Sequence, residues 1–257
     1  MSIIEVDNVV KTFTLSKKQM KINKSTEKNK VAVNGLSFKV EKGDCYGLLG
    51  PNGAGKTTTL RMMATLIKPD SGTITIDGSS VLTAPFEVRS KIAFLTSELK
   101  LEENFTPSYL FDYYSTLRGI DPLESKKWKD ELFQKFGITK FQEVKIGDLS
   151  TGMKQKASIA ISLVHNPDII IFDEPTNGLD VITAKMITDF LLSLKAEGKT
   201  IIVSTHIFSL IEHVCNRVGV IINGKMVKED TLENLTKEKN LEDAFFDIYV
   251  NEMGGQE

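Results

Sequence analysis

Short apolar runs alternate with longer stretches of helical character along most of the chain. Several of these runs are rich in valine and isoleucine and are bounded by turn residues, which predicts strands. Strands that alternate with helices indicate an α/β fold with a mainly parallel sheet. The predicted strands span 3–9, 37–40, 45–49, 73–76, 92–95, 169–172, 200–204 and 218–222, with helices at 56–67 and 181–197 and a hairpin turn at Asn223-Gly224.

A different pattern fills residues 97–165, which contain little strand character and several helix starts. Thr106-Pro107 and Asp121-Pro122 each place a helix-capping residue before a proline at the first helical position. A third helix is predicted to begin near Ser150. We interpret this stretch as a mostly helical lobe inserted into the α/β core.

Composition and charge narrow the class of protein. The chain has 257 residues, 41% of them apolar and 26% charged, which is ordinary for a soluble protein with a real core. Its net charge of -2 provides no overall basic field, so no nucleic-acid partner is expected. No apolar run approaches the roughly 20 residues that cross a bilayer, and the start lacks a secretion signal. We therefore expect a cytosolic protein, with any membrane part supplied by another chain.

Lysines are concentrated in residues 16–30, which have little apolar content. The plainer interpretation is a solvated surface loop. The alternative is contact with acidic lipid head groups or with a partner, since clustered lysines are attracted to an anionic surface. The lysines are Lys17, Lys18, Lys21, Lys24, Lys28 and Lys30.

A glycine-rich loop lies between the predicted strand 45–49 and the helix that follows it. Its glycines let successive backbone N–H groups point into one anion-binding hollow, to which the helix adds its positive end. In such a loop Lys56 reaches the β- and γ-phosphates and the Thr57 hydroxyl binds Mg²⁺. ATP and Mg²⁺ are therefore the predicted ligands. The predicted ATP-binding residues here are Gly50, Pro51, Asn52, Gly53, Ala54, Gly55, Lys56, Thr57 and Thr58.

Two carboxylates follow the apolar strand 169–172. Asp173 is placed to hold Mg²⁺, directly or through water, as in phosphate-loop ATPases. Glu174 is the better candidate for polarising the attacking water. Alone, this pair of carboxylates is weak evidence for nucleotide hydrolysis, but together with a phosphate loop it is strong evidence.

Residues 149–156, Leu-Ser-Thr-Gly-Met-Lys-Gln-Lys, resemble the LSGGQ signature of ATP-binding cassette proteins. Ser150 and Gly152 are retained, whereas Thr151 replaces a glycine and Met153 a glutamine. The resemblance extends over most of the chain. Pro175 to Asp180 resembles the D-loop of the family, His206 its switch histidine, and Phe13 the aromatic residue that stacks on adenine.

The resemblance implies a single cassette domain. Residues 1–96 and 166–230 would form a phosphate-loop NTPase core with an N-terminal antiparallel β-subdomain. Residues 97–165 would form a helical subdomain and 231–257 a helical tail.

The resemblance also implies a mechanism and partners. Two cassette subunits pair head to tail, identical or different, so that Ser150, Thr151, Gly152, Met153 and Asp180 of one chain contact the ATP held by the other. Hydrolysis would use Glu174 and His206 and would drive a membrane-spanning permease. The finer resemblance is to the NatA-like sodium-efflux group of bacterial exporters, which implies a cytoplasmic location, peripheral at the inner face of the cell membrane.

One departure concerns the glutamine that the family usually places after the strand that here is 92–95. The chain continues Thr96-Ser97-Glu98 instead. Either Ser97 or Glu98 would reach Mg²⁺ through water, or neither touches the metal.

A soluble ATPase that assembles or remodels a complex is the alternative function. A module that binds ATP without hydrolysing it is disfavoured, because the lysine, both carboxylates and the histidine are all present.

Aromatic residues are concentrated early in the helical lobe. We expect most of them to pack the core of the lobe itself. The resemblance implies a nearby groove for a coupling helix of the membrane subunit, so one or two would be exposed. They are Phe105, Tyr109, Phe111, Tyr113 and Tyr114.

Overall fold

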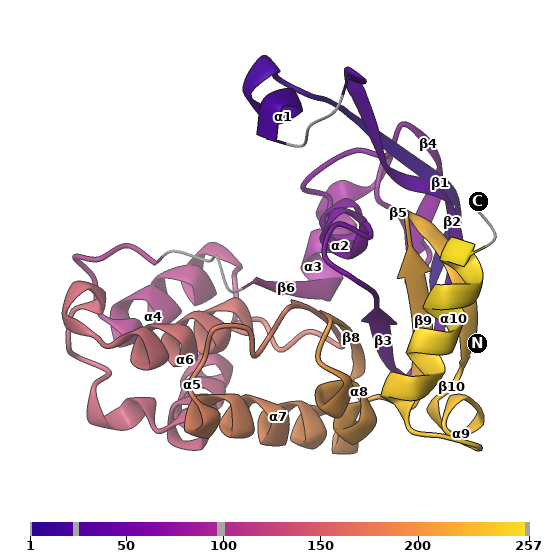
Figure 1. The fold of residues 1–257 in the computed structure, drawn as a ribbon. Helices are drawn as coiled ribbons and strands as arrows, with labels where there is room; N and C mark the ends of the chain where they lie inside the picture. Colours follow the sequence, from indigo (N-terminus) through magenta and orange to yellow (C-terminus); the bar gives the residue numbers. More distant parts are fainter. Residues whose placement is uncertain (1, 23–25, 97–100, 255–257) are drawn as a thin grey trace.

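Two sheets form the body of the computed structural model, which describes residues 2–22, 26–96 and 101–254 (Figure 1). The four-stranded antiparallel sheet has the order β2-β1-β4-β5 and the six-stranded sheet the order β10-β9-β3-β8-β7-β6. In the larger sheet only β10, the second strand of the Asn223-Gly224 hairpin, is antiparallel to its neighbour among the described strands. The predicted α/β class with a mainly parallel sheet and an added antiparallel sheet is confirmed. The strands are β1 (Ser2–Thr14), β2 (Asn29–Glu41), β3 (Cys45–Leu49), β4 (Ser71–Ile76), β5 (Ser79–Ser80), β6 (Ile92–Thr96), β7 (Ile169–Asp173), β8 (Thr200–Thr205), β9 (Arg217–Ile222) and β10 (Lys225–Thr231).

The central strands read as continuous apolar runs because both of their faces are covered. In β7, Ile170 and Phe172 join one hydrophobic cluster, whereas Ile169 and Ile171 join the other. Strands β3 and β8 are likewise buried along their whole length. Only apolar side chains fit such positions at low cost, so the strand ends are where polar groups can enter.

Helices fill the space on both faces of the six-stranded sheet. Helix α2 (Lys56–Met63) contacts β2 and β4 of one sheet and β7 and β8 of the other, so it lies between the two sheets. The opposite face is covered by α7 (Val181–Ala196) and α8 (Phe208–Val214). Helix α3 (Pro85–Lys91) precedes β6. The chain ends with α9 (Leu232–Leu235) and α10 (Leu241–Gly254), which pack near β10 (Figure 1).

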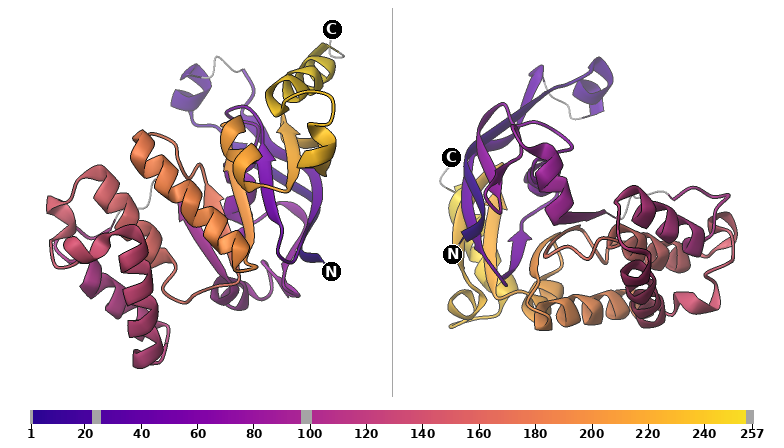
Figure 2. Two further views of the ribbon diagram at one scale, coloured as in Figure 1. Left: turned by 90° about the horizontal axis from the view of Figure 1, so that it is seen from below. Right: turned by 180° about the vertical axis from the view of Figure 1, so that it is seen from behind.

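From residue 101 on, the stretch between β6 and β7 is mostly helical, as predicted, and projects to one side of the sheets (Figure 2). Thr106 caps α4 by accepting the Tyr109 N–H at 3.2 Å, and Asp121 caps α5 by accepting the Leu123 N–H at 2.9 Å. Both predicted helix starts are therefore confirmed. The elements are α4 (Pro107–Leu117), α5 (Pro122–Phe136), the 3₁₀ turns η1 (Ile138–Lys140) and η2 (Ile146–Asp148), and α6 (Thr151–Ser162).

The lysine-rich segment is not a simple loop. Pairing of β1 with β2 continues to Thr14 and Asn29, and α1 (Lys17–Ile22) stands at the tip of this hairpin (Figure 1). Lysine and glutamine have good helix propensity, so a short helix forms here without an apolar stripe to reveal it. In contrast, α2 is shorter than predicted, because Thr65 adopts a positive φ of 62° after its last turn.

Most aromatic side chains of α4 point outward, contrary to expectation. Phe111 is buried in the core of the lobe. Phe105, Tyr109 and Tyr113 instead form a stacked row on the outer face, with ring centroids 4.7 and 6.2 Å apart. Tyr114 is also 39% exposed. The four-residue spacing of Tyr109 and Tyr113 puts both rings on one face of α4, whereas Leu110 and Phe111 occupy the buried face.

Candidate nucleotide-binding site

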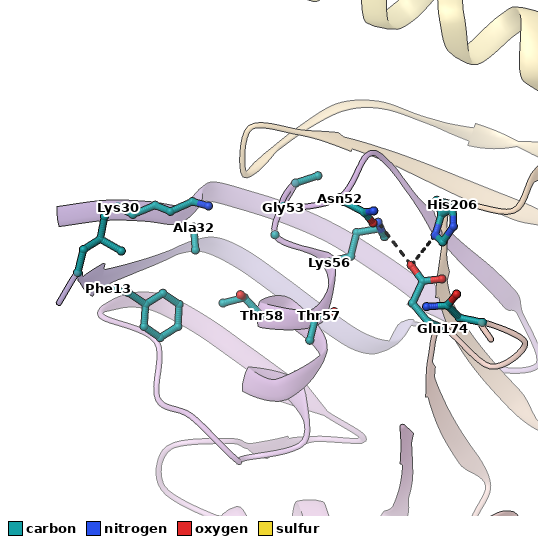
Figure 3. A pocket seen from close by; sticks show the side chains of 14 residues that line it. Phe13, Lys30, Ala32, Asn52, Gly53, Lys56, Thr57, Thr58, Glu174 and His206 are labelled. Atoms are coloured by element: carbon teal, nitrogen blue, oxygen red, sulfur yellow. Dashed lines mark hydrogen bonds and ion pairs between the residues drawn. The ribbon is translucent and has the colours of Figure 1, made fainter. Parts of the chain in front are cut away.

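A cavity of about 530 Å³ lies over the N-terminal end of α2 (Figure 3). Phe13 and Lys30 lie at one end of it, Glu174 and His206 at the other, and the glycine-rich loop lies between them. Strands β1 and β2 contribute lining residues directly, whereas the glycine-rich loop, Glu174 and His206 follow the ends of β3, β7 and β8. The lining residues are Phe13, Leu15, Lys30, Ala32, Asn52, Gly53, Ala54, Gly55, Lys56, Thr57, Thr58, Glu174, Asn177 and His206.

Close backbone packing explains two of the loop glycines. A Cβ on Gly50 would lie 2.2 Å from the Ile221 carbonyl oxygen, and a Cβ on Gly55 would lie 2.4 Å from that of Ala32. Gly55 also has a φ of 105°, which L side chains rarely adopt. These positions therefore exclude any side chain. Gly50 and Pro51 do not line the cavity themselves, but their carbonyl groups hold Lys56.

Lys56 provides a buried positive charge in the loop. Its ammonium donates to the Gly50 carbonyl at 2.7 Å and lies 3.8 Å from Glu174 Oε1. Burial lowers the pKa of Lys56, and the carboxylates of Glu174 and Asp173 oppose that shift. The arrangement suits an anion with several charges, because a phosphate chain would face one fixed cation and the N-terminal end of a helix.

Thr57 and Asp173 meet beside this cation. The Thr57 hydroxyl donates to Asp173 Oδ1 at 3.0 Å, and Asp173 is 5% exposed at the end of β7. A hydroxyl and a carboxylate are oxygen donors of the kind that Mg²⁺ accepts alongside phosphate oxygens. The residues present therefore fit this ion. Ser97 and Glu98, the other candidates for the metal, lie outside the described residues.

Glu174 lines the cavity together with His206. Its Oε1 is 3.1 Å from His206 Nδ1, whereas its Oε2 is buried without a hydrogen-bond partner among the described residues (Figure 3). A buried carboxylate oxygen needs a donor, and a water molecule bound in the cavity would supply one. The arrangement fits a group that orients or deprotonates water.

Phe13 is 38% exposed and pairs across the hairpin with Lys30, so the two side chains flank the open end of the cavity. The Lys11 ammonium lies 5.6 Å from the centre of the Phe13 ring. Sequence reasoning missed Leu15, Lys30, Ala32 and Asn177 as lining residues. Of these, Lys30 was detectable in principle. Extending the predicted strand 37–40 towards the N-terminus, as far as Asn29, places Lys30 opposite Phe13 in the hairpin.

The residues expected to act across a dimer lie elsewhere. Ser150 caps α6 by accepting the Met153 N–H at 3.3 Å, and Asp180 caps α7 by accepting from Ile182 and Thr183. A Cβ on Gly152 would lie 3.1 Å from the Thr183 hydroxyl, so the two helix starts adjoin. The hydrogen bonds from Thr183 lower the pKa of Asp180. None of Ser150, Thr151, Gly152, Met153 and Asp180 lines the cavity.

A phosphate-binding loop between a parallel strand and a helix, near two carboxylates at the end of β7, which is separated from β3 by β8, defines a phosphate-loop nucleotide hydrolase. Residues 33–177, more than half of the chain, match the family described as ABC transporter. The chain belongs to this family of ATP-binding cassette proteins, and it binds and hydrolyses ATP.

The chain is similar to several known members. It is 40% identical over 230 residues to the ABC transporter ATP-binding protein NatA of Bacillus subtilis (strain 168), covering 88% of this chain and 93% of that protein. It is 38% identical over 201 residues to the Nod factor export ATP-binding protein I of Burkholderia orbicola (strain AU 1054), covering 78% and 66%. A dimeric ATP-binding cassette solved in a post-hydrolysis state with ADP and Pi has a TM-score of 0.77 and 26% identity, covering 89% of this chain and 98% of that one.

Proposed function

We propose that the chain is the ATPase subunit of an exporter, which drives a separate membrane-spanning permease through ATP-dependent closure of two cassette subunits. The observation that carries this proposal is the separation of the site into two parts. The phosphate loop, Glu174 and His206 line one cavity, whereas Ser150 and Asp180 lie outside it. Such a site is half of a composite one.

Within one subunit each group has a distinct task. The Phe13 ring stacks on adenine, and the loop N–H groups with Lys56 bind the β- and γ-phosphates. Thr57 and Asp173 hold Mg²⁺, which neutralises charge on the phosphates when it is bound. Glu174 orients the attacking water and takes its proton, and His206 holds the Glu174 carboxylate in place at 3.1 Å.

The second subunit completes the site. Its Ser150 hydroxyl and Gly152 N–H would donate to the γ-phosphate, and closure would exclude water and strengthen these interactions. Loss of the γ-phosphate on hydrolysis removes the attraction between subunits. We propose that the chain divides into a core (1–96 and 166–230), a helical subdomain (97–165) and a tail (231–257).

The helical lobe supports a membrane partner. A second cavity of about 430 Å³, mostly apolar, lies where the lobe joins the core, with Phe94, Leu101, Tyr114 and Val164 among its lining residues. The exposed aromatic row of α4 continues from it. We propose that a helix of the permease docks here and that the chain works in the cytoplasm at the inner face of the membrane. The relative named for Nod factor export supports the direction of transport.

None of the helices in the described ranges 2–22, 26–96 and 101–254 is long and apolar enough to cross a bilayer.

Tyr113→Ala combined with Tyr114→Ala is expected to reduce recovery of a polytopic membrane protein with the tagged chain by about tenfold, because the variant removes exposed apolar surface at the proposed docking site. The measurement is affinity purification from detergent-solubilised membranes, followed by mass spectrometry. Leu123→Ala is the control, since Leu123 is 80% exposed on α5 and away from the groove. If the unaltered chain recovers only soluble proteins, the transporter proposal fails and an assembly ATPase takes its place.

Phe13→Ala is expected to weaken ATP binding by about tenfold or more, since stacking of a base on an aromatic ring contributes roughly 1–3 kcal/mol. Titration calorimetry would measure this loss, and inorganic triphosphate, which has no base, should bind both forms equally. Phe86→Ala serves as the control because Phe86 is 75% exposed on α3 and does not line the cavity. Equal weakening of ATP and triphosphate would show that Phe13 supports the loop and does not stack on the base.

A further inference from the structure

Ser204 lies at the end of β8, directly opposite Asp173 in the parallel pairing of β7 with β8. Its side chain is fully buried, and its hydroxyl donates to Asp173 Oδ1 at 2.5 Å. The Thr57 hydroxyl donates to the same oxygen at 3.0 Å. Two hydroxyl groups therefore converge on one carboxylate oxygen. Asp173 Oδ2 receives no hydrogen bond from the part of the chain that the structure describes.

The backbone of the same serine holds the next carboxylate. The Glu174 N–H donates to the Ser204 carbonyl oxygen at 2.9 Å. Glu174 has a φ of 49°, in the left-handed region that is unfavourable for residues other than glycine. This bend turns the chain out of β7 and brings the Glu174 carboxylate to His206 (Figure 3). A strained bend persists only where its surroundings fix it, and the bond to Ser204 is such a restraint.

The two hydroxyl groups on Asp173 differ in what they can do when nucleotide is bound. Thr57 lies in the cavity, so its oxygen is open to a metal ion. Ser204 is 0% exposed and cannot reach a ligand, so its hydroxyl serves Asp173 alone. A hydrogen bond to a charged group in a low-dielectric interior is strong, which suits it to fixing the rotation of the carboxylate.

We propose that Ser204 is a positioning residue: its hydroxyl holds Asp173 so that the second carboxylate oxygen stays available to Mg²⁺, directly or through water, while its carbonyl holds the bend at Glu174. The inference rests on the proposed role of Asp173 in metal binding. Ser204 thereby sets the orientation of both carboxylates, that of Asp173, which binds the ion, and that of Glu174, which binds the attacking water.

Ser204→Ala tests the hydroxyl and leaves the carbonyl bond to Glu174 intact. We expect the Mg²⁺ concentration that half-saturates the nucleotide complex to rise by about tenfold, as for the loss of a hydrogen bond to a charged group. ATP affinity in EDTA should stay within about twofold of the parent. The measurements are Mg²⁺ titrations of ATP binding, and Mn²⁺ binding followed by electron paramagnetic resonance. Neither readout depends on turnover.

Thr200→Val is the matched control. Thr200 is a buried residue at the other end of β8, where its hydroxyl accepts the Gly43 N–H at 2.9 Å, far from the carboxylates. It should leave metal dependence unchanged. Equal shifts in both variants would mean general loosening of the strand, and an unshifted Ser204→Ala would overturn the inference. Asp173→Asn distinguishes failure of the Ser204 role from failure of the metal-binding role of Asp173. If Asp173→Asn also leaves the Mg²⁺ dependence unchanged, Asp173 does not bind the metal.

Discussion

Replacing Glu174 with glutamine is expected to lower the rate of ATP hydrolysis by at least about a hundredfold, while ATP still binds and holds two subunits together. Glutamine has nearly the same shape, so it can keep the contact with His206 that Glu174 Oε1 makes at 3.1 Å. It cannot accept a proton from water at the position of Oε2, which is buried and has no partner among the described residues. This variant should therefore bind ATP like the parent but hydrolyse it slowly.

Phosphate release under saturating ATP measures the turnover of Glu174→Gln, and light scattering after gel filtration measures its mass. With ATP and Mg²⁺ the variant should elute as a dimer, and with ADP as a monomer. Glu233→Gln removes an exposed carboxylate on α9 and should hydrolyse ATP like the parent. Turnover of Glu174→Gln near that of the parent would remove this residue from the role of general base.

Lys56→Ala is expected to weaken ATP binding by about a hundredfold or more. The variant removes a cation that is 5% exposed and lies 3.8 Å from the Glu174 carboxylate. Asp173 and Glu174 would then repel the incoming phosphates without a compensating cation, and a hydrogen bond to a charged group contributes roughly 1.5–3 kcal/mol. At about 1.4 kcal/mol per factor of ten, much of the affinity should be lost.

Titration of a fluorescent ATP analogue measures this loss. Lys68→Ala is the control, because Lys68 is exposed and follows α2 without lining the cavity. Circular dichroism of both variants should match that of the parent, since α2 and the surrounding strands are held by an apolar core that does not include the lysine head group. Unchanged affinity in a folded Lys56→Ala protein would contradict the assignment of the phosphate loop.

The phosphate loop and the two carboxylates could be predicted from the sequence, because a local sequence pattern identifies each of them. A buried strand before a glycine-rich loop, and another before two carboxylates, each occupy a few consecutive residues. The helix starts at Thr106 and Asp121 could be predicted for the same reason, because a capping side chain accepts a hydrogen bond from the N–H of a residue two or three positions later in the chain. Such features follow from the chain without knowledge of its tertiary packing.

Other features depend on partners far away in sequence. The contact of Ser204 with Asp173 joins residues 31 apart and exists only because β7 and β8 pair in this register. Lys30 reaches the cavity because β2 begins at Asn29, eight residues before the predicted start at 37, and pairs there with β1. The outward aromatic row of α4 also escaped prediction, since aromatic residues are more often buried.

The path of the chain between β6 and β7 has a consequence for how this protein can change. These strands are hydrogen-bonded neighbours, paired from Ile92 with Ile169 to Thr96 with Asp173, yet the whole helical lobe lies between them in sequence. Because this pairing is parallel, the chain leaves β6 at Thr96 and returns to β7 at Ile169, at opposite ends of two adjacent strands at the edge of the sheet. A segment attached in this way can be exchanged, shortened or diversified with little strain on the sheet. Selection for a new membrane partner could therefore act on the lobe while the hydrolytic machinery stays as it is.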